Sequence, residues 1–123
     1  MIRIVGLNRN ENPMQEFLLL QNQGSLRQNI RGLAVVAEAS IDDGAHANGV
    51  HLFAESELIP AGCFILLRTG VGIPRWTKTK DGQLIYNAYI GRDESLWINI
   101  SGPIHVLTPQ HTWVERKEHV TVV

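Results

Sequence analysis

The chain has 123 residues, of which 44% are hydrophobic and 19% are charged, and its formal net charge at pH 7 is −1. This length predicts a single domain, and the apolar content excludes a chain that is disordered throughout. The near balance of charges excludes a general attraction to nucleic acid or to an anionic membrane, but it leaves room for a local basic patch.

The predicted secondary structure consists of short strands separated by turns rich in Gly, Asn and Pro. Gly32 interrupts one of these strands and is expected to mark a bulge or a close backbone approach. A bulge would let Ile30, Leu33 and Val35 all face inward. We predict loops at 8–13, 40–49 and 69–82. The predicted strands, of which the last two form a hairpin around a turn at 101–103, are 2–6, 16–22, 30–37, 50–54, 63–68, 84–90, 96–100 and 104–107.

The strand predicted at 16–22 is apolar on both faces. Leu18 and Leu20 share one face, and Phe17 and Leu19 share the other, because side chains alternate along a strand. A half-exposed strand would alternate apolar with polar residues. We therefore expect either that the domain covers both faces, or that Phe17 and Leu19 lie at a sheet edge and contact a partner, with self-association as the first expectation.

Cys63 is the only cysteine, so no disulfide can form within the chain. It begins the apolar run 63–67, which favours a small buried side chain over a reactive thiol. Apolar runs reach only about five residues, far below the length of a membrane span. With no signal peptide at the start of the sequence, we expect no membrane span and, by default, a cytoplasmic location.

No long window has helical apolar periodicity, and about seven to nine short strands favour an all-β fold. For this length, the first expectation is an immunoglobulin-like antiparallel two-sheet sandwich. The sandwich is expected to span 1–110, and 111–123 to form a C-terminal strand or tail. The pair of cysteines found in antibody domains is absent.

The order of these strands resembles the lamin-tail domain family. The resemblance covers about residues 2 to 107 and departs at Leu33, where the family has a Trp. It implies an immunoglobulin-like sandwich and a non-catalytic module that binds partners or tethers other domains. No catalytic residue is carried over. The matching segments are 16–22, 30–35, Phe53 with 59–62, 66–72 and 96–106.

The strongest candidate binding residues lie in the predicted loop at 69–82. Arg75, Trp76, Lys78 and Lys80 place three cations and an indole within six residues. These groups could bind phosphates and stack on a base, which gives an alternative function as a nucleic-acid or polyanion binder. The alternative interpretation is a solvated loop in which Trp76 plugs one end of the sandwich.

Catalysis and metal binding have weaker signals. Asp42, Asp43, His46 and His51 could serve a small hydrolase or bind a metal ion, but their spacing matches no ligand pattern, and a solvated loop explains them equally well. We therefore predict a non-catalytic structural or protein-interaction module with no cofactor and no metal.

Overall fold

The computed structural model describes residues 1–42 and 48–109, and strands dominate it. Two short helical segments interrupt them, the helix α1 (Glu38–Asp42) and the 3₁₀ helix η2 (Trp97–Asn99). In chain order the strands are β1 (Ile2–Asn8), β2 (Phe17–Asn22), β3 (Gln28–Asn29), β4 (Ala34–Ala37), β5 (Val50–Leu52), β6 (Leu58–Ile59), β7 (Phe64–Arg68), β8 (Arg75–Lys78), β9 (Leu84–Tyr89) and β10 (Ile104–Leu107).

The larger sheet has five strands in the order β1-β2-β7-β9-β8. The expectation of purely antiparallel pairing is wrong, because β7 and β9 run parallel. After β7 the chain passes over one strand position, runs back along the sheet edge as β8, and returns between the two as β9. The remaining strands form a three-stranded sheet, β10-β4-β5, and a two-stranded sheet, β3-β6.

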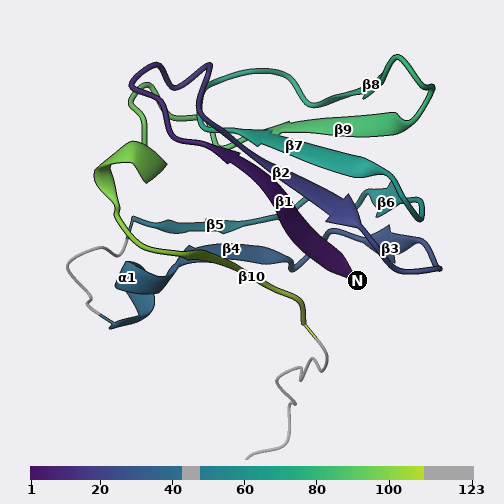
Figure 1. Ribbon diagram of the computed structural model, residues 1–123, viewed down its shortest axis with the longest axis horizontal. Helices are drawn as coiled ribbons and strands as arrows, with labels where there is room; N and C mark the ends of the chain where they lie inside the picture. Colours follow the sequence, from purple (N-terminus) through teal and green to yellow (C-terminus); the bar gives the residue numbers. More distant parts are fainter. Residues whose placement is uncertain (43–47, 110–123) are drawn as a thin grey trace, which may run out of the picture.

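The five-stranded and the three-stranded sheets lie in separate layers (Figure 1), and the hydrophobic core draws residues from both. Leu18 and Leu20 from β2 are fully buried, as their shared face predicted, and Trp97 is fully buried as well. Cys63 is half-buried and packs against this core. The other core residues are Ile2, Ile30, Leu33, Val35, Ala37, Phe53, Ile59, Ile65, Leu67, Tyr86, Ala88, Leu96 and Ile100.

Gly32 forms a turn and not a bulge. The Leu33 N–H donates to the Ile30 carbonyl, and Gly32 has φ +85°, the geometry of a type II turn between β3 and β4. The predicted strand 30–37 therefore begins only at Ala34. Ile30, Leu33 and Val35 are nevertheless all buried, as expected.

The predicted strand at 96–100 is also wrong, because this segment forms η2. No hairpin joins it to β10, which pairs instead with β4. Two further segments predicted as loop carry regular structure, namely α1 at the start of 40–49 and β8 within 69–82.

Candidate functional site

The outer face of the five-stranded sheet carries an apolar centre. Cross-strand pairs set Leu19 beside Leu66 and Phe64 beside Ile85, on the side of the sheet opposite the core. All four side chains are half-buried. Polar residues lie among these positions on the same face, since Gln21 pairs with Phe64, Asn87 pairs with Leu66, and Arg68 stands between Phe17 and Tyr89. We call the set Phe17, Leu19, Phe64, Leu66, Ile85 and Tyr89 the outer apolar face.

Phe17 and Leu19 belong to this face, but the expected sheet edge is wrong. β2 is an inner strand with β1 on one side and β7 on the other, so its backbone groups are paired within the sheet. Any contact through Phe17 and Leu19 must therefore be made by side chains across the sheet face and not by adding a strand.

A shallow hollow of about 470 Å³ adjoins the outer apolar face at Tyr89. The loop after β7 lies against Tyr89, since a Cβ added at Gly72 would meet the tyrosine ring. This loop leaves Val71 63% and Ile73 84% exposed, and Met14 lines the same hollow. Such exposure of large aliphatic side chains beside an apolar sheet face is typical of a contact surface.

The cationic residues predicted to bind a polyanion lie on different sides of β8 and in the turn after it. Arg75 faces the same side as Asn87, whereas Trp76 faces the core side with Tyr86. Lys78 follows Trp76 on the core side because alternate residues share a face, and Lys80 is exposed in the turn after β8. The structure thus does not gather the three cations on one surface.

Trp76 is engaged by neighbouring residues within the domain. Its ring lies 5.2 Å from that of Tyr86, and its indole N–H donates to Glu57 over 3.4 Å. The Tyr86 hydroxyl donates to Glu55 over 3.0 Å. Burial first, and the two carboxylates second, raise the pKa of Tyr86. Trp76 remains 37% exposed. The negative charges of Glu55 and Glu57 nearby oppose the approach of a phosphate to its indole.

The residues of the hydrolase hypothesis are only partly in view. Asp43 and His46 lie outside the described residues, whereas Asp42 ends α1 and His51 lies in β5. Burial lowers the pKa of His51, against the opposing charge of Glu55, and its ring packs edge-on against Phe53. Across residues 1–42 and 48–109, no three His, Cys, Asp or Glu side chains are grouped to hold a metal ion.

Most of the outer apolar face was missed by the sequence analysis. Leu66 and Phe64 lie in the apolar run 63–67, a strand that is apolar on both faces, as the run 17–20 is. This common pattern could have indicated that the two strands are neighbours in one sheet. Ile85 and Tyr89 carried no comparable signal because their strand also bears Asn87.

Comparison with protein-family models, curated proteins and solved structures found no match. In the part of the chain that is described, no helix has the length and apolarity to cross a membrane.

Proposed function

We propose that this protein is a non-catalytic protein-interaction module and that it associates with a second copy of itself through the outer apolar face. The observation that carries the proposal is the cluster of half-buried apolar side chains on the outer side of the five-stranded sheet, beside the exposed Val71 and Ile73. Protein interfaces have a hydrophobic core, and large aliphatic side chains left exposed beside an apolar face are typical of a contact surface.

An immunoglobulin-like sandwich of the lamin-tail type is the fold that we propose for this module. The order of strand motifs and a core shared by two sheets support it. Modules of this kind act by presenting a surface, and the proposed surface needs no cofactor.

Sedimentation velocity over a wide range of protein concentration tests the proposal. We expect the wild-type chain to form a dimer, and Leu19→Lys to be monomeric at concentrations where the wild type is dimeric. A lysine at the centre of the face would lose its hydration in the interface without gaining a partner. The half-buried position lets the lysine reach solvent in the monomer.

Leu26→Lys is the matched control, because Leu26 is 78% exposed and lies between β2 and β3, outside the outer apolar face. It adds the same charge and should leave the dimer unchanged. A wild-type chain that stays monomeric at about millimolar concentration would refute self-association, as would equal weakening by both variants.

A further inference from the structure

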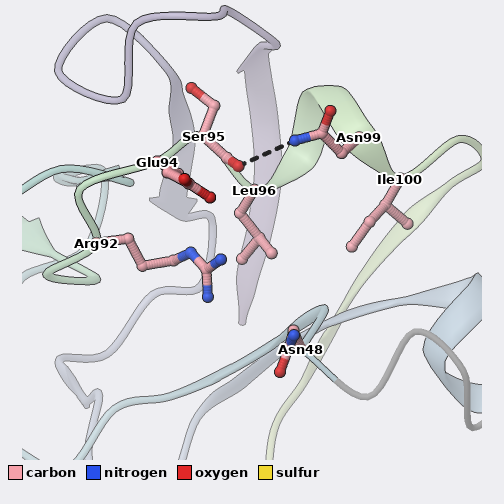
Figure 2. A pocket seen from close by; sticks show the side chains of 7 residues that line it. All are labelled: Asn48, Arg92, Glu94, Ser95, Leu96, Asn99 and Ile100. Atoms are coloured by element: carbon pink, nitrogen blue, oxygen red, sulfur yellow. Dashed lines mark hydrogen bonds between the residues drawn. The ribbon is translucent and has the colours of Figure 1, made fainter.

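A second hollow, of about 170 Å³, opens where the segment 92–100 meets the start of β5 (Figure 2). Leu96 and Ile100 give it an apolar floor. Its polar groups come from Asn48, Arg92, Glu94, Ser95 and Asn99. It is distinct from the outer apolar face, since the two share no lining residue.

Arg92 is the unusual member of this group. Its Nε is buried and has no hydrogen-bond partner. Among the described residues, the one ion pair joins His105 to Glu38. No described carboxylate therefore lies within 4 Å of the Arg92 guanidinium. A buried donor left without an acceptor costs about 1–3 kcal/mol, and the described residues provide none for this Nε.

The other polar groups of the hollow can form hydrogen bonds with the part of a ligand that does not contact Arg92. Asn99 donates one N–H to the Ser95 carbonyl over 3.2 Å, which fixes the orientation of its amide beside the hollow (Figure 2). Asn48 is exposed on the opposite wall and offers both a donor and an acceptor. These amides suit a hydroxyl or carbonyl group on a ligand.

Size and charge narrow the class of ligand. A planar guanidinium binds a carboxylate through two parallel hydrogen bonds. The hollow has room for about six water molecules at liquid density, which restricts it to a small molecule. Glu94, on the same lining, adds a negative charge that opposes a dianion more strongly than a monoanion.

We infer that this hollow binds a small monocarboxylate, with its carboxylate on the Arg92 guanidinium and its short carbon chain over Leu96 and Ile100. The site does not depend on self-association. It can therefore be tested in the monomeric Leu19→Lys variant as well as in the wild type.

Titration with sodium propionate, followed by ¹H–¹⁵N correlation spectra, tests the inference. We expect saturable shifts of the backbone amides of residues 92–100, with a dissociation constant in the millimolar range. Sodium chloride at the same ionic strength should give no saturable shift, and inorganic phosphate should bind at least tenfold more weakly than propionate.

Arg92→Gln should weaken propionate binding at least tenfold. Arg92→Lys, which keeps the charge and loses the planar fork, should also weaken it and serves if the glutamine variant does not fold. Arg75→Gln removes an equal charge from exposed β8 and should bind propionate as the wild type does. The absence of saturable shifts, equal affinity in either Arg92 variant, or tighter binding of phosphate would overturn the inference.

Discussion

Glu16 is a fully buried carboxylate on which the local structure at the end of the core depends. One of its oxygens accepts the hydroxyl of Thr69 and the backbone N–H groups of Leu96 and Trp97 at 2.7–2.9 Å. The other accepts the Ile98 N–H at 2.9 Å. Three successive amides that converge on one carboxylate require a helical turn, because successive N–H groups of a strand point in opposite directions. Glu16 therefore explains why η2 replaces the predicted strand.

Replacement of Glu16 by Gln should destabilise the protein by about 2–4 kcal/mol, since the new amide would place a donor against a buried donor and remove the charge that strengthens the other hydrogen bonds. Urea unfolding measures the change. Glu11→Gln, at an exposed position, should stay within about 0.5 kcal/mol of the wild type.

The effect of Glu16→Gln should depend on pH. Burial alone would raise the pKa of the Glu16 carboxyl, but hydrogen bonds from Thr69, Trp97, Leu96 and Ile98 together hold it below its ordinary value of 4.5. The charged group thus contributes its full stabilisation above about pH 4.5 and loses it as the pH falls through the lowered pKa. The stability difference between wild type and variant should narrow in acid, and a constant difference would contradict this account.

Among the elements, tight turns with glycine at a positive φ set where several strands begin. Gly32 and Gly62 occupy the third position of turns closed by hydrogen bonds from Leu33 to Ile30 and from Cys63 to Pro60. Each turn directly precedes a core strand, β4 or β7. A side chain at either glycine would strain the backbone and disturb the start of that strand.

Gly32→Ala and Gly82→Ala should each lose about 1–2 kcal/mol, because both glycines have φ above +80°. A Cβ at Gly82 meets nothing within 4 Å, whereas one at Gly32 would lie 3.3 Å from Pro109. Gly82→Ala therefore isolates backbone strain, and Gly32→Ala should lose at least as much. Asn at either position should recover part of the loss, since Asn tolerates a positive φ. Unfolding midpoints equal to that of the wild type would contradict this.

Strands with strong local signals could be predicted from the sequence. β1, β2, β5, β7, β9 and β10 are confirmed within a few residues, although β10 is not part of the predicted hairpin. The errors arose where distant partners decide the structure. β8 has an exposed sequence of polar residues and an indole, and it is a strand only because β9 offers a free edge. Nothing near residue 96 signals that Glu16 will organise it.

At the scale of the whole molecule, the parallel pair β7–β9 decides which residues meet on the outer sheet face. Had β8 followed β7 as its direct neighbour, Ile85 and Tyr89 would lie farther from Leu66. The uninterrupted apolar runs at 17–20 and 63–67 could predict two strands with apolar outer faces. The strand order that joins them to β9 has no local signal. The candidate surface could thus be predicted only in part.

If the outer apolar face joins two copies, thermal stability should depend on protein concentration. Association of the folded state stabilises it by mass action, so the melting temperature of the wild type should rise by a few degrees for each hundredfold increase in concentration. Differential scanning calorimetry measures this shift. Leu19→Lys should abolish the concentration dependence, and a melting temperature that is constant in the wild type would contradict the proposal.

The contacts around η2 also bear on the synthesis of the protein. Arg9 donates to the carbonyls of Trp97 and Gly102, and Glu16 accepts from the Trp97 N–H. The partners of both residues therefore lie more than 80 positions later in the chain. At about 5–20 residues per second, a ribosome needs roughly 4–16 s to make that interval. During that time Glu16 lacks the backbone donors of Leu96, Trp97 and Ile98. The nascent chain therefore cannot close this end of its core until the segment at 96–102 has left the ribosome.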